Sequence, residues 1–175
     1  MGSAYPDIYA AVGVHSGLAC GAARDMPSAF AAMRQGGAPP ARAKRGDRAS
    51  RFAVPTIVFH GDGDNTVHPV NADQVIAQAK AERRLVLAVS RGKAPGGMDY
   101  TRTVQTDEGE NPVLEQWVLH GAGHAWSGGS SAGTYTDPRG PDASREMLRF
   151  FRQHANSAAA PGKELATHAS GDDAG

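Results

Sequence analysis

Three things are scarce in this sequence: cysteine, excess charge of either sign, and long apolar runs. Cys20 is the single cysteine among the 175 residues, which excludes an internal disulfide and a cysteine-rich zinc site. The 18 basic and 18 acidic residues balance, whereas a nucleic-acid-binding protein usually has a basic excess and a disordered chain a large net charge. No apolar run approaches the roughly 18–20 residues that span a bilayer. Neither nucleic acid nor a membrane is an expected partner.

The remaining composition is that of a chain with many turns. The 22 glycines and 11 prolines favour turns and loops throughout. A length of 175 residues fits one domain with a sizeable buried core. We therefore expect an α/β domain, and neither a fibrous nor a disulfide-stapled protein.

Four segments are predicted to be strands. Residues 8–15 form a short apolar run without clean alternation, which is typical of a strand buried on both faces. Residues 54–60 give the strongest strand signal, and Pro55 lies at its start, where a missing N–H does least harm. Residues 100–106 and 113–120 are predicted to form a hairpin around the intervening polar turn.

Three segments are predicted to be helices, at residues 28–33, 71–81 and 141–154. The alternation of strands and helices predicts a parallel sheet with helices on its faces. The number of strands is small for a sheet of that kind, so the pattern resembles the second half of a larger domain.

Three further segments are predicted to be irregular. Residues 41–51 form a basic segment, expected to be a solvated loop, and residues 91–98 are expected to be a flexible loop. Residues 155–175 contain one large apolar residue, Leu165, which buries too little surface to offset the ordering entropy. We therefore expect a domain over residues 1–154 and a disordered tail over residues 155–175.

A cluster of acids follows the strand predicted at residues 54–60. The turn at residues 61–69, GDGDNTVHP, contains Asp62 and Asp64. In open α/β sheets, functional groups gather outside the carboxyl ends of the strands, so an acid here could orient a histidine. The alternative is an acidic turn that only caps the helix at residues 71–81.

A histidine follows the last predicted strand in a similar way. Residues 119–129 read LHGAGHAWSGG, and His124 lies between small residues that leave its ring uncrowded. A loop at a strand end can hold a general base while exposing it to substrate. Trp126 could form one wall of such a site. The alternative is a surface histidine in a glycine-rich loop.

Metal and thiol chemistry are not expected. His120 and His124 are four residues apart, and His60 or His68 could extend them to a cluster, but the intervening glycines argue against a helix and no HExxH or Cys-His spacing occurs. Cys20 lacks an electropositive helix start beside it, so it is not expected to be a catalytic thiol.

No serine in the sequence has the setting of an esterase nucleophile. Residues 129–133 match the G-x-S-x-G pattern around Ser131, but no apolar strand enters this segment and no helix leaves it. Ser16 does not fit the pattern either. The neighbouring His15 is expected to be a satisfied core or edge residue at the end of a strand.

Two motifs occur in a fixed order: HGxxDxxV at residues 60–67 and GxGHxW at residues 121–126. Together with the segments at residues 5–17 and 136–143, they resemble serine esterases of the polyhydroxybutyrate depolymerase type, within the α/β-hydrolase superfamily and related to feruloyl and acetylxylan esterases. The resemblance extends over about residues 4–154, up to and including the last predicted helix. It implies the C-terminal half of an α/β-hydrolase sheet with flanking helices.

The resemblance also implies a set of site residues. Asp64 matches the catalytic acid of the family, His124 the catalytic histidine, and Trp126 an aromatic residue beside that histidine that would contact substrate. Asp62 matches no catalytic position. The expected substrate is an ester: a polyester such as polyhydroxybutyrate, its oligomers, a feruloyl or acetyl sugar, or a small aryl ester. No cofactor and no metal are implied, and an extracellular location is expected because members of the family are commonly secreted.

The serine nucleophile of the family precedes the Tyr5-Pro6-Asp7 block, so we expect it to lie upstream of residue 1 and this chain to be nearly inactive by itself. We also expect an exposed sheet edge that favours oligomers. Two alternatives stay open: a catalytically dead fragment or binding remnant, and a histidine-based metal-dependent hydrolase.

Overall fold

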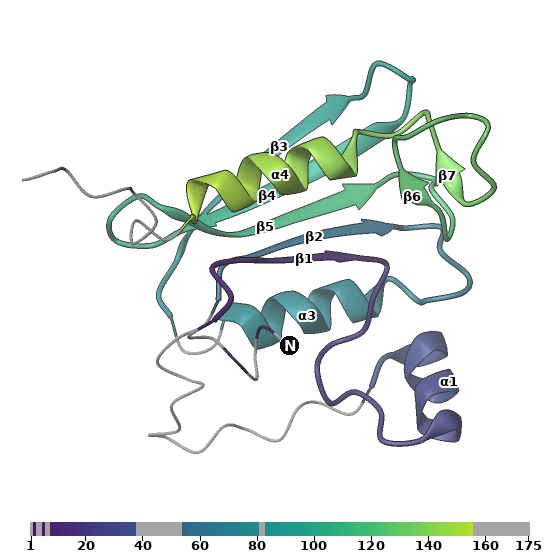
Figure 1. Ribbon diagram of the computed structural model, residues 1–175, viewed down its shortest axis with the longest axis horizontal. Coiled ribbons are helices and arrows are strands. Elements are labelled where there is room, and N and C mark those ends of the chain that lie inside the picture. Colours follow the sequence, from purple (N-terminus) through teal and green to yellow (C-terminus); the bar gives the residue numbers. More distant parts are fainter. Residues whose placement is uncertain (1, 3–4, 6–7, 38–53, 81–82, 156–175) are drawn as a thin grey trace, which may run out of the picture.

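The computed structural model describes residues 2, 5, 8–37, 54–80 and 83–155. They form an α/β fold around a five-stranded sheet (Figure 1). In spatial order the strands are β1 (Val12–His15), β2 (Thr56–Gly61), β5 (Pro112–Leu119), β4 (Asp99–Thr106) and β3 (Val86–Lys93). The first three are parallel to one another, and β4 and β3 continue the sheet in antiparallel pairing. The sheet is therefore mixed.

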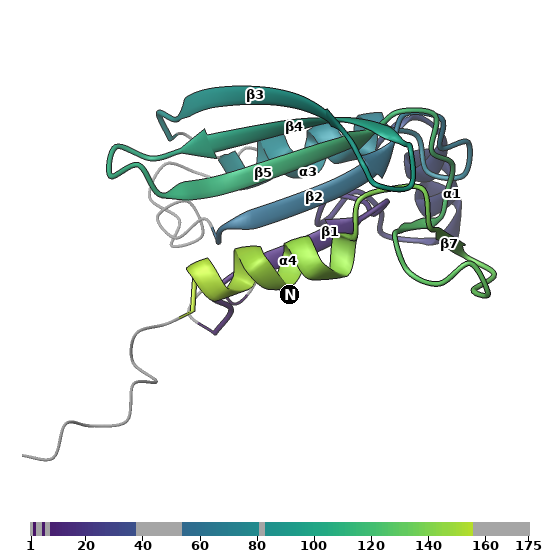
Figure 2. The same cartoon turned by 90° about the horizontal axis from the view of Figure 1, so that it is seen from above.

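The described residues contain three helices, namely α1 (Met26–Gln35), α3 (Val70–Lys80) and α4 (Ala143–Gln153). The helices α3 and α4 lie against opposite faces of the sheet, as Figure 2 shows from above. Strand β2 is buried along its whole length, and its side chains alternate between the two faces. Ile57 and Phe59 join the core under α4, whereas Val58 joins the core under α3.

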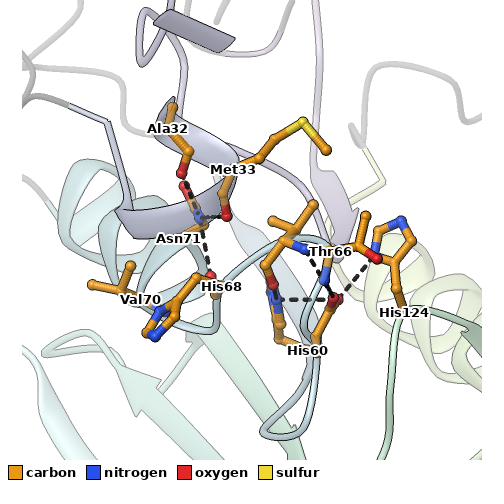
Figure 3. A network of polar contacts seen from close by, with 10 residues as sticks. Ala32, Met33, His60, Thr66, His68, Val70, Asn71 and His124 are labelled. Carbon is orange, nitrogen blue, oxygen red and sulfur yellow. Dashed lines mark hydrogen bonds and ion pairs between the residues drawn. The ribbon is translucent and has the colours of Figure 1, made fainter. Parts of the chain in front are cut away.

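The remaining helix, α1, docks against the start of α3. Asp25 caps α1 by accepting a hydrogen bond from the Ser28 N–H (2.8 Å). Asn71 is fully buried, and its Nδ2 donates to the carbonyl oxygens of Ala32 and His68, at 3.0 Å each (Figure 3). These bonds hold the turn between β2 and α3 in place, and that turn carries the predicted acid.

Most of the predicted elements are present. Each of the three predicted helices forms, with α1 longer than predicted at both ends. The strongest strand signal corresponds to β2, and the predicted hairpin corresponds to the antiparallel pair β4–β5. These segments were predictable because their apolar spacing matches a single period of secondary structure.

Two predictions about strands are wrong. Within residues 8–15 the strand covers Val12–His15 alone, and it is half-buried rather than buried on both faces, because within the described residues it pairs on one side with β2 only. The segment at residues 91–98 is not a loop throughout, since β3 continues to Lys93 in register with β4. The apolar run LVLAV at residues 85–89 indicates a strand, but most of β3 is exposed, so here such a run does not mark a buried strand.

A second, two-stranded sheet formed by β6 (Trp126–Ser127) and β7 (Thr136–Asp137) was not predicted. A strand of two residues is too short to show an alternation of apolar and polar residues, so the sequence does not predict it. This small sheet shapes the loop that follows His124.

Two predicted irregular segments cannot be compared with the structure. The basic segment at residues 41–51 and all but the first residue of the tail at residues 155–175 lie outside the described residues. Among the helices that the structure describes, none is both long enough and apolar enough to cross a membrane.

Candidate active site

The candidate site is built where two neighbouring parallel strands end. β2 and β5 run in register up to the pair Gly61 and Leu119, so the loops that follow them leave the same edge of the sheet. The Gly63 N–H donates to the Ala122 carbonyl oxygen (3.1 Å) and ties the two loops together. A Cβ atom at Gly61 would lie 2.7 Å from the Ala122 carbonyl carbon. The loops meet this closely because residue 61 is glycine.

Asp64 is buried at the centre of this junction. Its Oδ1 accepts hydrogen bonds from the N–H groups of Thr66 (2.9 Å) and Val67 (2.8 Å), and its Oδ2 lies 2.8 Å from Nδ1 of His124. Burial by itself raises the pKa of the Asp64 carboxyl, but these hydrogen bonds and the nearby imidazole outweigh burial and hold the pKa below its usual value. Asp64 is therefore a carboxylate that is fixed in one orientation.

His124 presents the other ring nitrogen to solvent. A carboxylate only accepts hydrogen bonds, so Nδ1 of His124 carries the proton that points to Asp64, and Nε2 keeps a free lone pair. The imidazole is 40% exposed although Asp64 is completely buried. The predicted contact between Asp64 and His124 is thus present, in the geometry of an acid that orients a general base.

A second histidine, His60, lies beneath the pair and was not predicted to belong to it. Its Nε2 donates to the Val67 carbonyl oxygen (2.8 Å) and is 3.5 Å from Asp64 Oδ2, as the dashed lines in Figure 3 indicate. The ring is buried, and within the described residues its Nδ1 has no hydrogen-bond partner. The only sequence signal was its position at the end of the buried strand β2.

His15 supports the loop that carries His124. Its Nε2 accepts a hydrogen bond from the Ser127 N–H (2.9 Å), and its ring is stacked on Trp126 and Phe59, with centroid distances of 4.7 and 5.9 Å. Burial, reinforced by the charges that His60 and His124 can carry, lowers the pKa of His15 to about 4 despite the attraction of Asp64. His15 is therefore a neutral acceptor above pH 5, and it belongs to an edge strand, as expected.

Trp126 lies two residues after His124, and its ring stacks on the imidazole of His15. The residue is 38% exposed, and its Nε1 donates to the Ser144 hydroxyl (3.2 Å). One ring face is thus held by the fold while part of the side chain stays accessible.

The other predicted candidates lie apart from this pair. Asp62 bonds to His120, with 2.8 Å between Oδ2 and Nδ1, and not to His124. Ser131 belongs to an exposed turn between the two-residue strands β6 and β7, and no helix directly follows it, as expected from its sequence context. Cys20 is exposed. In the parts of the chain that the structure describes, no three histidine, cysteine or acidic side chains are grouped so that they could hold a metal ion.

Ser16 is the one serine near this edge of the sheet with an unusual backbone. It follows β1 with φ of 48°, and its buried hydroxyl has no hydrogen-bond partner among the described residues. Within the same residues, no hydroxyl group is hydrogen-bonded to Nε2 of His124.

One comparison with known proteins finds a match. A family model described as Esterase PHB depolymerase matches residues 1–97, more than half of the chain. The matched segment includes Asp64 and ends before His124. No curated protein matches the chain.

Proposed function

The chain belongs to the esterase PHB depolymerase family, and on that premise we propose that it is the part of a carboxylic ester hydrolase that supplies the acid and the base of a Ser-Asp-His triad. In this proposal residues 1–154 are the C-terminal part of an α/β-hydrolase domain, Asp64 is the acid and His124 is the base.

One observation carries the assignment of the pair: Asp64 Oδ2 lies 2.8 Å from His124 Nδ1, with the carboxylate buried and the imidazole exposed. A surface histidine without a catalytic role has no need of a buried carboxylate that is itself held by two backbone N–H groups. Such an arrangement fixes the tautomer and the orientation of the ring, which are the tasks of the acid in a triad.

The chemistry that follows is acyl transfer. A serine hydroxyl attacks the ester carbonyl carbon while His124 Nε2 takes its proton, and the imidazolium then gives that proton to the departing alcohol. Water repeats the sequence on the acyl-serine and releases the carboxylic acid. Asp64 stabilises the positive charge that develops on His124 in both halves of the reaction.

We propose that the nucleophilic serine lies outside these 175 residues. Two observations support this. Ser131 lies in an exposed turn without the strand and helix of a nucleophile elbow. The edge of β1 that faces away from β2 is unpaired within the described residues, and a further strand of an α/β-hydrolase sheet would pair there and bring its terminal loop beside His124.

The proposed substrate is a polyester of a hydroxy acid or one of its oligomers, a feruloyl or acetyl ester of a sugar, or a small aryl ester. Trp126 is proposed to contact it, because its partly exposed ring follows His124 by two residues. No cofactor is part of this proposal. An extracellular location, expected from the family resemblance, also stays a prediction.

Co-expression with the serine-bearing segment of another family member tests this proposal. The chain alone should hydrolyse p-nitrophenyl acetate with a steady-state turnover close to that of free imidazole, since a general base by itself contributes only about 10²–10⁴-fold. The complemented protein should hydrolyse the ester much faster. Asp64→Asn should then reduce kcat by about 10⁴-fold, as the corresponding change does in a protease triad, and His124→Ala should remove most of the activity.

Ser131→Ala provides the matched control, because Ser131 is the serine of the only G-x-S-x-G sequence in the chain. It should leave the complemented activity nearly unchanged. If the chain alone is fully active and Ser131→Ala abolishes that activity, then Ser131 is the nucleophile and lies within this chain. A complemented protein that folds and stays inactive would favour the binding remnant.

A further inference from the structure

His120 is held between the carboxylate of Asp62 and the hydroxyl group of Thr101, none of which belongs to the proposed triad. Nδ1 of His120 lies 2.8 Å from Asp62 Oδ2, and its Nε2 lies 2.9 Å from the Thr101 hydroxyl oxygen. The other oxygen of Asp62, Oδ1, accepts the Gly121 N–H (2.6 Å). The order of atoms is hydroxyl, Nε2, Nδ1, carboxylate, which is the order in which a catalytic triad is connected.

The direction of each hydrogen bond follows from the charge of Asp62. Burial is the largest single influence and opposes ionisation, but together the bonds from His120 and from the Gly121 N–H outweigh it and hold the pKa of the Asp62 carboxyl below its usual value. An ionised carboxylate only accepts, so Nδ1 of His120 carries a proton. In the neutral ring Nε2 is then an acceptor, and the Thr101 hydroxyl must donate to it. The hydroxyl proton therefore already points at a base.

The surroundings of Thr101 provide a cation and apolar surface. In the antiparallel pair of β3 and β4, Arg91 is the direct partner of Thr101, so both side chains leave the same face of the sheet. Leu87 and Val89 occupy the same face of β3 at alternate positions and are 58% and 56% exposed. A guanidinium beside the hydroxyl can stabilise a developing oxyanion, and the exposed aliphatic side chains can contact an apolar group.

We propose that Thr101 is an acyl-acceptor site, activated by His120 and Asp62, for activated esters with a small acyl group and an aryl leaving group. The Thr101 oxygen forms a bond to the carbonyl carbon, and its proton moves to Nε2 of His120. The bond from that carbon to the aryl oxygen then breaks, and the aryl oxide leaves with the electron pair and takes up the proton. The products are acyl-threonine and a phenol, with His120 neutral again.

This site is exposed to solvent and its steps end at the acyl-enzyme. The side chains of Asp62 and His120 are both 42% exposed, in contrast to the buried Asp64 of the proposed triad. Water screens the exposed Asp62 carboxylate more than the buried Asp64, so Asp62 stabilises positive charge on His120 less strongly. We therefore expect one acyl group transferred per chain, seen as a burst of phenol without fast turnover.

Reaction of the chain with p-nitrophenyl acetate, followed by peptide mass spectrometry, tests this proposal. Thr103 is the matched control: it lies two residues further along β4 on the same face, and no histidine is hydrogen-bonded to its hydroxyl in the described structure. Acetylation at Thr101 should be at least about 10²-fold faster than at Thr103, which is the contribution of a positioned general base.

Five variants distinguish activation of the Thr101 hydroxyl from its simple exposure. Thr101→Val should remove the burst of p-nitrophenol and Thr103→Val should leave it intact. His120→Gln and Asp62→Asn should each slow acetylation at Thr101 by at least about tenfold, and a near-native circular dichroism spectrum of either variant is sufficient to interpret the result. The labelling at Thr101 does not pass through His124, so it should persist in His124→Ala even where ester turnover is lost. Equal acetylation of Thr101 and Thr103, or no effect of either relay variant, would overturn the proposal.

Discussion

At the scale of single residues, His15 couples the stability of the site to pH. Its imidazole is stacked between two aromatic rings and accepts the Ser127 N–H, and burial lowers its pKa from 6.5 to about 4. In the unfolded chain the ring takes up a proton near pH 6.5, whereas in the folded chain it does so only near pH 4. Between these values the unfolded state binds more protons, so stability falls as the pH is lowered through this window.

We predict that His15→Gln weakens the decline of the free energy of unfolding between pH 6.5 and pH 4. Glutamine has an oxygen that can accept the Ser127 N–H but no group that titrates in this range. Urea unfolding at several pH values measures the slope in both proteins, and the difference near neutral pH gives the separate cost of the lost stacking. Parallel curves for the two proteins would contradict the assigned pKa.

At the scale of the elements, the approach of two loops positions the candidate pair. We predict that Gly61→Ala destabilises the protein by about 1–3 kcal/mol, the usual cost of an overpacked interior, because the new Cβ would displace the carbonyl group of Ala122. The same displacement should separate Asp64 from His124. Urea unfolding measures the first effect, and the loss of the low-field NMR signal of the His124 Nδ1 proton would report the second.

Gly123→Ala is the matched control in the opposing loop. A Cβ at residue 123 would meet no atom within 4 Å, and the backbone there does not have a positive φ. We expect its free energy of unfolding to stay within about 1 kcal/mol of the parent. An equal loss in both variants would show that the glycines matter for chain flexibility and not for the contact with Ala122.

A buried carboxylate links β5, β4 and α4. Glu115 is fully buried, accepts two hydrogen bonds from Arg102 (2.9 and 3.0 Å), and accepts further bonds from Arg149 (2.6 Å) and Trp117 Nε1 (2.7 Å). Burial favours the neutral acid, but these donors outweigh it and lower the pKa of Glu115. The ionised form is therefore the one that joins the three elements.

We predict that Glu115→Gln destabilises the protein by about 3 kcal/mol, since removing one partner of a buried ion pair leaves the other charge uncompensated. Glu146→Gln is the control: Glu146 also contacts Arg149 (2.7 Å), from the neighbouring turn of the same helix, but it is 26% exposed. Pairs of that kind contribute about 0.5 kcal/mol. Thermal and urea unfolding of the two variants should separate these values clearly, and similar losses would count against a special role of Glu115.

At the scale of the whole molecule, the sheet has two edges that are unpaired within the described residues, β1 and β3. The β3 edge carries three large apolar side chains that are 56–69% exposed: Val86, Leu87 and Val89. An exposed apolar edge strand is a template for pairing with a second chain. We therefore predict concentration-dependent association of the isolated chain.

Val89→Lys should reduce this association, because a charge on an edge strand is costly to bury against another chain. Sedimentation velocity over a range of concentrations measures the effect. Leu148→Lys serves as control, since Leu148 is also half exposed but lies on α4 and not on the edge strand β3. A parent protein that stays monomeric at all concentrations would contradict the prediction.

The sequence by itself determined most of the elements and the identity of the candidate residues. The apolar run of β2, the amphipathic pattern of α4, and the polar turns after β2 and β5 are local properties of the chain, so the acids and histidines at these strand ends are recognisable as candidates, and the family resemblance singles out Asp64 and His124. The strand β3 was not predicted, although the apolar run LVLAV at residues 85–89 is also a local property of the chain; its exposed position at the sheet edge is visible only in the structure.

The family resemblance singles out Asp64 and His124, but the local pattern of the chain does not decide which acid meets which histidine; the tertiary structure does. Asp62 and Asp64 are two residues apart, and the loop after β5 also carries two histidines, so the sequence allows several pairings. The parallel register of β2 and β5 and the close approach of their loops fix one of them: Asp64 with His124 inside, Asp62 with His120 outside. The partners that complete each group, Thr101 and His15, come from other strands. Contacts between distant strands follow from sheet topology and register, which no local pattern encodes.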